Sequence, residues 1–524
     1  MKKKLYIELI FLIILGMVTS LSLPPFNYLM INFLTFSLFF LFLIKKTNQH
    51  QNKRLFFFYG WLFGFGYFVT NLYWISISLT FDHNFKFLIP VAIILIPSFL
   101  GIFYGLASCF FAIFKTKKII NSFLIFSILF AIFEFVRGSV FTGFPWNLIA
   151  YSFLNQSEIL SIISLIGTYG FNLFCISLFT SPALIMLKKS NKEIFAFIFF
   201  LILLSTFYLY GIYYKKNFLS ADKIKYDYKV RAISSSISLD RFYLNSNPIL
   251  VIEELIKISD PIADEKTIFI WPEGILPNIS QDELIDYRWL FEDKFTKNHL
   301  LIIGINSQTT INTSTNHFNS LSVFDYELNL LNSYNKINLV PFGEFLPLEN
   351  LLSTIGLKTI TNNYQSYTKG DQRNVIEINK ENFSLRILPL ICYEIIYSGK
   401  IFDINNFDII VNISEDGWFG ESIGPKQHFA HSIFRSIESG KYIIRSANNG
   451  TSAIINSIGQ IEKSLNLNKN GYIDFDARNE IQPTVFSKFG NKIFGILILL
   501  YIFFIFSTSF MFSFNRTKTG FKNK

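Results

Sequence analysis

Apolar residues along this chain gather into long runs on either side of a more polar central stretch. Seven of these runs lie ahead of residue 214 and one follows residue 491. Each run is long enough to cross a hydrocarbon layer of roughly 30 Å as a helix. The runs cover residues 5–23, 28–44, 55–80, 88–114, 119–136, 159–187, 194–213 and 492–514. The pattern therefore predicts a multi-pass α-helical membrane bundle of about eight spans.

The central stretch has a different pattern, in which short β-rich runs alternate with amphipathic segments. The runs rich in β-branched and aromatic residues are 228–233, 267–271, 300–305, 321–324, 385–391, 408–413, 442–447 and 452–456. Helices are expected near residues 249–258, 281–295 and 425–439. This alternation favours a layered α/β domain with a buried sheet. We therefore expect three parts: helices 1 to 7 in residues 1–213, an α/β domain in residues 214–491, and helix 8 with a basic tail in residues 492–524.

Lysine and arginine collect in alternate connections between the apolar runs. They crowd the N-terminus, the connections near residues 45–54, 115–118 and 188–192, and the tail after residue 515. Because positive charge stays on the cytoplasmic side of a membrane, both termini are expected to be cytoplasmic. Residues 214–491 are then extracytoplasmic.

Composition narrows the classes of function. The chain has 524 residues, of which 51% are hydrophobic and 18% aromatic, and its net charge is +10. The charge does not predict nucleic-acid binding, because the basic residues lie in short clusters between apolar runs. Of the three cysteines, Cys109 and Cys175 lie inside apolar runs, which excludes a disulfide framework and a Cys-rich zinc site. Cys392 is left as a free thiol.

Three segments of the central domain present reactive side chains at or after a predicted strand. Glu273 follows the run that ends at Trp271, Lys336 precedes a Pro-Phe-Gly-Glu element, and Cys392 follows residues 385–391. A cysteine thiolate is a candidate nucleophile, a carboxylate can take its proton, and an ammonium can stabilise an oxyanion. Taken singly, each also has a structural interpretation: a loop carboxylate, a solvated lysine and a buried core cysteine.

Two other polar pairs have competing interpretations. His428 and His431 lie three apart on a predicted helix and could give two metal ligands. No third ligand is evident nearby, so a structural role is favoured. Glu134 and Arg137, also three apart, are expected to pair on one helix face near the outer membrane surface. A structural ion pair and a contact with a lipid head group remain alternatives for this pair.

Together, these residues resemble the Glu-Lys-Cys triad of the nitrilase superfamily. The motifs that carry the resemblance are Trp271-Pro272-Glu273, Tyr334-Asn335-Lys336, Pro341-Phe342-Gly343-Glu344, Cys392-Tyr393-Glu394 and Asp416-Gly417-Trp418-Phe419-Gly420. With the flanking apolar runs, the chain is similar to the apolipoprotein N-acyltransferase family, the membrane-embedded branch of that superfamily.

The resemblance implies a nitrilase-type α-β-β-α sandwich on the helical bundle, at the periplasmic side of a bacterial inner (cytoplasmic) membrane. It implies that Cys392 is the nucleophile, Glu273 the proton acceptor and Lys336 the group that stabilises the oxyanion. Supporting or substrate-binding roles are implied for Glu344, Tyr393, Glu394 and Trp418.

The reaction that the resemblance implies is a two-step acyl transfer. The sn-1 acyl chain of a phospholipid, typically phosphatidylethanolamine, would form a thioester with Cys392. The N-terminal amine of the diacylglyceryl-cysteine of an apolipoprotein would then accept the chain, which completes lipoprotein maturation. The implied partners are these two lipids and the bilayer, with no cofactor, no metal and no nucleic acid.

One segment and one single residue depart from the family pattern. Residues Ser234 to Ser238 stand where members often carry a Gln-x-Asn stretch, and Glu415 stands where an asparagine is usual. The first departure would change substrate contacts, and the second would change how the loop before Trp418 closes.

Two other classes of function stay open on the sequence. One is a membrane-tethered amidohydrolase of the nitrilase type, in which water resolves the acyl-enzyme. Seven preceding spans argue against it, because a hydrolase needs only an anchor. The other is a non-catalytic lipid-binding or transport protein, for which inverted repeats are expected but not seen.

Overall fold

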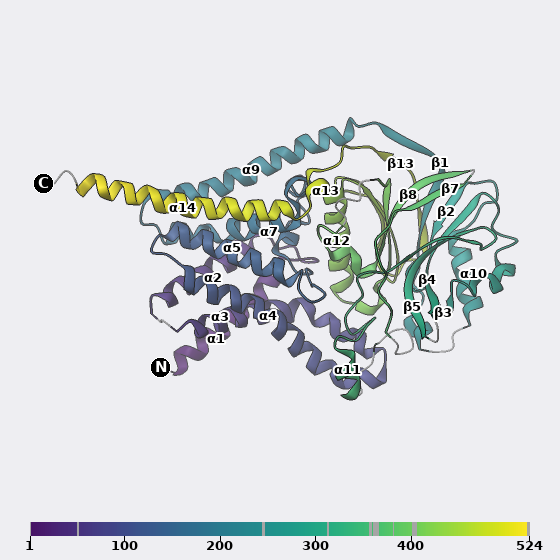
Figure 1. Cartoon of the computed structure of the whole chain (residues 1–524), viewed down its shortest axis with the longest axis horizontal. Coiled ribbons are helices and arrows are strands. Elements are labelled where there is room, and N and C mark those ends of the chain that lie inside the picture. Colours follow the sequence, from purple (N-terminus) through teal and green to yellow (C-terminus); the bar gives the residue numbers. More distant parts are fainter. Residues whose placement is uncertain are drawn as a thin grey trace.

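The computed structural model places a bundle of apolar helices beside a domain of two β-sheets (Figure 1). The structure describes residues 2–49, 52–243, 247–311, 314–355, 359, 366–380, 382–400 and 406–520. In Figure 1 the bundle lies on the left, the sheets lie on the right, and helix α12 (Gly424–Ser439) lies between them.

Each of the eight apolar runs forms helix. The elements are α1 (Lys2–Ser20), α2 (Ile31–Thr47), α3 (Lys53–Leu72) with η1 (Tyr73–Thr80), η2 (His83–Leu88) with α4 (Ile89–Phe114), α5 (Ile119–Arg137), η3 (Ile149–Phe153), α6 (Ser157–Leu160), α7 (Ile163–Thr180), α8 (Pro182–Met186), α9 (Asn191–Leu219) and α14 (Lys492–Gly520). Local signals set some of these ends. The side chains of Ser190 and Glu193, for example, form a capping box at the start of α9.

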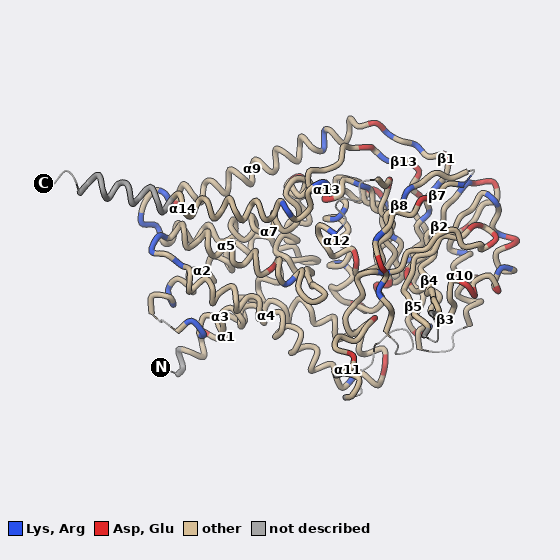
Figure 2. The backbone as a smooth tube through the Cα atoms, viewed as in Figure 1, with Lys and Arg blue, Asp and Glu red and all other residues tan. Residues whose placement is uncertain are grey.

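Five helical segments of the described chain are long and apolar enough to cross a membrane. They are residues 53–80, 83–114, 119–137, 163–186 and 191–219. The apolar parts of α1 and α14, residues 5–20 and 492–507, are shorter, and α2 has 17 residues. The expectation of eight spans therefore stays a prediction. Figure 2 shows that lysine and arginine gather at the end of the bundle that points away from the sheets.

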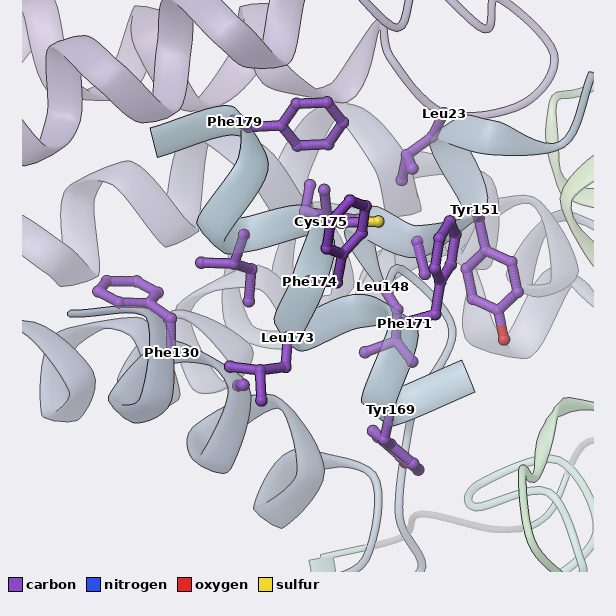
Figure 3. Close-up of a cluster of buried hydrophobic side chains, with 14 of the residues drawn as sticks. Leu23, Phe130, Leu148, Tyr151, Tyr169, Phe171, Leu173, Phe174, Cys175 and Phe179 are labelled. Carbon is purple, nitrogen blue, oxygen red and sulfur yellow. The ribbon is translucent and has the colours of Figure 1, made fainter. Parts of the chain in front are cut away.

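Helix α7 forms the centre of the bundle core. Its side chains Phe171, Phe174, Cys175 and Phe179 are almost fully buried and pack together in the close-up of Figure 3. Cys175 therefore behaves as a small hydrophobic residue. The helix bends at Gly167, whose φ is 68°, and a Cβ atom there would lie 2.0 Å from the ring of Phe486. Only glycine fits both constraints.

The central domain contains two sheets that pack face to face. In the first, the strand order is β13-β1-β2-β4-β5-β6, with β3 beside β4, and in the second it is β12-β11-β10-β9-β8-β7. The strands are β1 (Lys223–Ser234), β2 (Thr267–Ile270), β3 (Leu276–Ser280), β4 (His299–Ile311), β5 (Ser314–Asp325), β6 (Leu330–Asn335), β7 (Ile376–Lys380), β8 (Phe383–Ile391), β9 (Ile409–Glu415), β10 (Tyr442–Asn448), β11 (Ser452–Ile455), β12 (Ile461–Leu465) and β13 (Gly471–Asn479). Strands β1, β2 and β4 are parallel, and so are β8, β9 and β10.

Helices cover the outer faces of both sheets and complete a nitrilase-like α/β sandwich. Alternate side chains such as Ile268 of β2 and Ile409 of β9 fill the space between the sheets. Helix α10 (Pro248–Ser259) packs on the first sheet through Leu255. Helix α12 packs on the second sheet, and its Phe434 belongs to a buried cluster that continues into the bundle. The α/β domain and the bundle therefore share one hydrophobic core.

One helix expected from the sequence is wrong. Residues 281–295 form only a short 3-10 helix, η5 (Leu284–Leu290), between turns. Leu284, Phe291 and Phe295 are the fully buried residues of this segment. These three positions are spaced i, i+7 and i+11, which is the spacing of one helix face, so the apolar pattern alone predicted a continuous helix where the chain forms turns.

Candidate active site

A buried lysine and two carboxylates lie together beside the ends of strands β2 and β6 of the first sheet. Lys336 follows β6, and its Nζ is 2.9 Å from Oε1 of Glu273 and 2.9 Å from Oε1 of Glu344. Asn319 of β5 donates its Nδ2 to the same two oxygens, at 2.8 and 2.6 Å. The backbone N-H of Glu415 donates to Oε2 of Glu273 at 2.9 Å. Both oxygens of the Glu273 carboxylate are therefore fixed.

This cluster has one ammonium for two carboxylates. Burial lowers the pKa of the Lys336 ammonium, but the charges of Glu273 and Glu344 outweigh burial and raise that pKa well above its ordinary value. Lys336 is therefore a permanent cation at neutral pH. Burial raises the pKa of the Glu344 carboxyl, while Lys336 acts in the opposite direction.

Cys392 lies immediately after β8, at the start of the 3-10 helix η8 (Cys392–Ile396). Its side chain is buried, and its φ of 45° is in the left-handed region that non-glycine residues rarely adopt. Burial raises the pKa of the Cys392 thiol well above its ordinary value, and the charge of Glu273 raises it further, while Lys336 lowers it. Because the thiol is protonated at neutral pH, it needs a base to become a nucleophile.

Glu394 binds the segment after Lys336 to the segment that carries Cys392. Its Oε1 accepts the backbone N-H of Ile337 at 3.0 Å, and its Oε2 accepts that of Ile391 at 2.9 Å. Arg373 donates Nη2 to Oε1 at 2.7 Å and keeps the pKa of this buried carboxyl low, although burial acts in the opposite direction. The carboxylate is saturated with donors, so it holds these two segments together.

Tyr393 extends from the same 3-10 helix toward the bundle. Its hydroxyl donates to the carbonyl of Gly143 at 3.1 Å, in the loop that follows α5. Arg137 donates to the carbonyl of Phe144 in the same loop and pairs with Glu134, as the sequence predicts. The Arg137 side chain has no exposed surface, which favours the structural ion pair over a lipid head-group contact.

Trp418 lies on the loop after β9 and is half-buried among aromatic side chains. Its ring centroid is 5.0 Å from that of Phe242 and 6.4 Å from that of Tyr243, both in the α/β domain. On the other side, Phe81 of the bundle lies 6.1 Å away. Trp418 therefore bridges the two parts of the molecule at their surface.

The two segments that depart from the family pattern meet in space. Glu415 forms a buried ion pair with Arg241, whose Nη1 donates to the carbonyl of Ser238 at 2.9 Å. Asn448 donates to Oε2 of Glu415 at 2.7 Å and accepts the hydroxyl of Ser235 at 2.7 Å. The Ser234 to Ser238 segment and the loop that binds Glu273 are thereby held together.

We expect Arg241→Met to lower the free energy of unfolding by about 3–5 kcal/mol at neutral pH, because it leaves the Glu415 carboxylate buried and unpaired. Burial already raises the pKa of Glu415, and this variant raises it further. Because the pKa of Glu415 is then higher in the folded state than in the unfolded state, the free energy of unfolding falls as the pH rises through the folded-state pKa. The loss of stability in Arg241→Met should therefore be smaller at pH 5 than at pH 8. Thermal unfolding of the purified protein at both pH values measures this difference.

Arg288→Met is the matched control, because that side chain is 40% exposed in its pair with Glu327. It should change stability by no more than about 1 kcal/mol. The double variant Arg241→Met/Glu415→Gln should regain part of the loss. A double variant that is less stable than Arg241→Met would contradict this interpretation of the pair.

Sequence patterns did not point to every residue of the site. Asn319 carries no motif, and only the pairing of β5 with β6 brings it to Lys336.

The two histidines have a different surrounding from a metal site. The Nδ1 atom of His428 lies 2.9 Å from Oδ1 of Asp416, and its Nε2 atom lies 3.2 Å from the carbonyl oxygen of Cys392. His431 packs on the ring of Trp146. Across the described ranges, no three His, Cys, Asp or Glu side chains gather to hold a metal ion.

Comparison with known proteins identifies the family. Residues 15–179 match the apolipoprotein N-acyltransferase N-terminal domain, and residues 269–484 match carbon-nitrogen hydrolase. Among solved structures, a Saccharomyces cerevisiae member of branch 10 of the nitrilase superfamily is 15% identical, with a TM-score of 0.34, and the match covers 49% of this chain and 93% of that one.

Curated relatives match along almost the whole chain. The apolipoprotein N-acyltransferase of Rickettsia prowazekii is 31% identical over 521 residues, which cover 97% of this chain and all of the relative. That of Rickettsia bellii is 32% identical over 508 residues, which cover 95% of this chain and 96% of the relative. With both halves of the molecule matched in this order, the chain belongs to the apolipoprotein N-acyltransferase family.

Proposed function

We propose that this protein is an apolipoprotein N-acyltransferase that works through a thioester on Cys392. The observation that carries the proposal is the buried Glu273-Lys336 pair, 2.9 Å from carboxylate to ammonium. Cys392 follows β8, and the neighbouring strand β9 ends at Glu415, whose backbone N-H binds Glu273 at 2.9 Å. Family membership supplies the substrates: a phospholipid as acyl donor and an apolipoprotein as acceptor.

In the first step, Glu273 takes the proton of the Cys392 thiol. The thiolate attacks the carbonyl carbon of the sn-1 ester, and negative charge develops on the carbonyl oxygen. Lys336 and a backbone N-H near Tyr393 stabilise this oxyanion, and each such donor typically contributes a few kcal/mol. When the ester C-O bond breaks, the lysophospholipid leaves with the proton from Glu273. A thioester remains on Cys392.

In the second step, the free α-amine of a diacylglyceryl-cysteine attacks the thioester carbon, and Glu273 accepts a proton from the amine. The C-S bond breaks, the proton passes to the Cys392 sulfur, and the acyl chain is now held in an amide. Thiol and carboxylate return to their starting state, so the cycle needs no co-reactant. Glu344 supports this cycle by fixing Lys336, with Nζ 2.9 Å from its Oε1.

The contact between the site and the bundle supports a lipid donor over a soluble substrate. Tyr393, next to Cys392, binds the loop at Gly143, and Trp418 packs on Phe81 of the bundle. A hydrolase that needs only an anchor gains nothing from such contacts. The strained backbone at Cys392 argues against a purely lipid-binding protein, because strain of this kind collects at active sites. The donors that saturate the buried Glu394 hold the segment that carries Cys392 in place.

The proposal includes the membrane arrangement. All eight helical runs, α1 to α5, α7, α9 and α14, would span the membrane, with residues 214–491 as the catalytic domain between the seventh and eighth spans. Lysine and arginine gather at the end of the bundle away from the sheets (Figure 2), which supports cytoplasmic termini and a periplasmic catalytic domain in a bacterial inner membrane.

The experiment that tests this function follows an acyl chain. Purified protein is incubated with phosphatidylethanolamine labelled in its sn-1 chain, and we expect label on Cys392 through a hydroxylamine-sensitive bond. Cys392→Ala should lose the label, and Cys109→Ala, which changes a cysteine inside α4, should keep it. Label that persists without Cys392 would refute the thioester.

A second measurement separates the acyltransferase from the hydrolase. A synthetic diacylated lipopeptide with a free N-terminal amine is added to the labelled protein. We expect the label to move to the amine of the peptide, and an N-acetylated peptide should leave the label on the protein. Release chiefly as free fatty acid would instead indicate the amidohydrolase-like alternative.

A further inference from the structure

The backbone at Cys392 is strained and must be held by its surroundings. Its φ of 45° places a residue with a side chain in the left-handed region, which persists only where neighbouring groups determine it. The carbonyl oxygen of Cys392 has one such neighbour, Nε2 of His428, at 3.2 Å. A carbonyl oxygen only accepts hydrogen bonds, so Nε2 carries the hydrogen in this contact whichever charge state the ring has.

His428 is itself fixed on every side. The ring is fully buried, and the side chain of Trp146 stacks on it, with ring centroids 5.3 Å apart and planes 16° apart. Its Nδ1 lies 2.9 Å from Oδ1 of Asp416 and 3.2 Å from Nη2 of Arg445. Arg445 also binds Oδ2 of Asp416 at 2.8 Å. The ring therefore cannot turn away from Cys392 without breaking a buried network.

The preceding residue, Gln427, connects the same turn of α12 to the bundle. Its Oε1 accepts the indole N-H of Trp146 at 2.9 Å and that of Trp74 at 3.3 Å. Its Nε2 donates to the carbonyl of Pro24 at 3.1 Å and to Oδ1 of Asn71 at 3.3 Å. All four hydrogen-bonding positions of the amide are used, on three separate segments of the bundle.

We propose that His428 is a positioning residue for the nucleophile. It holds the carbonyl of Cys392 so that the thiol faces Glu273 and Lys336, and Gln427 sets this turn relative to the bundle. The inference rests on the proposed function for its role in acyl transfer. It goes beyond that function, because it assigns the orientation of the thiol to His428 and the alignment of this turn with the bundle to Gln427, two residues that take no part in the chemistry.

The test uses two substitutions of His428, each of which replaces one of the two ring nitrogens by an amide nitrogen. The amide nitrogen of His428→Gln reaches about as far as Nε2, and that of His428→Asn reaches only about as far as Nδ1. Two rates are measured for each variant: thioester formation with labelled phosphatidylethanolamine, and alkylation of Cys392 by iodoacetamide, followed by peptide mass. Thermal unfolding is recorded for both.

We expect His428→Asn to slow both reactions of Cys392 by about 100-fold, the usual cost of misplacing a reacting group by about 1 Å. His428→Gln should recover most of both rates. Equal rates in the two variants, or losses that follow the unfolding temperature alone, would overturn the proposal. Alkylation needs no lipid, so it tests the position of the thiol independently of acyl transfer. If the parent protein forms no thioester, that result counts only against the proposed function.

Gln427→Met gives a second, independent readout. It should leave alkylation of Cys392 unchanged and slow thioester formation from phosphatidylethanolamine by about tenfold or more, because the bundle and the thiol lose their alignment. A parallel loss of both rates would assign Gln427 to folding alone and overturn its part of the proposal.

Discussion

Glu273→Gln is expected to slow thioester formation at Cys392 by about 10²- to 10⁴-fold, the usual contribution of a positioned general base. The thiol cannot compensate, because burial raises its pKa and leaves it protonated near neutral pH. The amide is also a poor replacement in this site. Each oxygen of Glu273 faces donors, from Lys336 and Asn319 on one side and Glu415 N-H on the other, so the new NH₂ group must oppose one of them.

The pH dependence distinguishes a lost base from a damaged site. Without Glu273, thiolate forms only by loss of the proton to solvent, so the residual rate should rise about tenfold per pH unit between pH 7 and 9. The parent enzyme should rise less steeply. Rapid-quench labelling with phosphatidylethanolamine measures both rates, and Glu292→Gln, at a carboxylate that is 57% exposed, serves as control. Parallel pH profiles in parent and Glu273→Gln would contradict the assignment of the base.

Short-range patterns in the sequence were sufficient to predict most of this fold. Runs of about 20 apolar residues predicted the helices of the bundle, and β-rich runs predicted the buried strands such as β2, β8, β9 and β10. The missed strands have a different character. All five residues of β12 are exposed or half-exposed. Apolar and polar residues alternate in β7 and β13 and are mixed in β3 and β6, so the sequences of these strands lack the apolar run. Pairing with neighbours, rather than local preference, forms these strands.

The candidate site shows the same division between local and long-range information. Glu273, Lys336 and Cys392 could be named because each stands in a recognisable motif near a strand. The sequence could not predict the contacts of Asn319, Arg241 and His428, because their partners lie far away along the chain. The meeting of Glu415 with the Ser234 to Ser238 segment likewise depends on β1 and β10 lying together, which the pairing of residues 235 and 448 records.

Lys336→Met is expected to have the second large effect, on rate and stability together. Loss of the ammonium removes the proposed oxyanion donor, which should slow thioester formation by about 10²- to 10³-fold. It also leaves Glu273 and Glu344 facing each other with only Asn319 between them. Breaking a buried ion pair in this way should lower the free energy of unfolding by about 3–5 kcal/mol at neutral pH.

The sign of the pH effect follows from the carboxyl pair. Burial already raises the pKa of Glu344, and without Lys336 the repulsion from Glu273 raises it further. The folded state then binds a proton that the unfolded state has released, so stability falls as pH rises through the folded-state pKa. The deficit of Lys336→Met should therefore be smaller at pH 5 than at pH 8. Thermal unfolding at both values measures it, with exposed Lys297→Met as control. A deficit that does not change with pH would mean that the two carboxylates do not share a proton, and the cluster would need another source of neutralising charge.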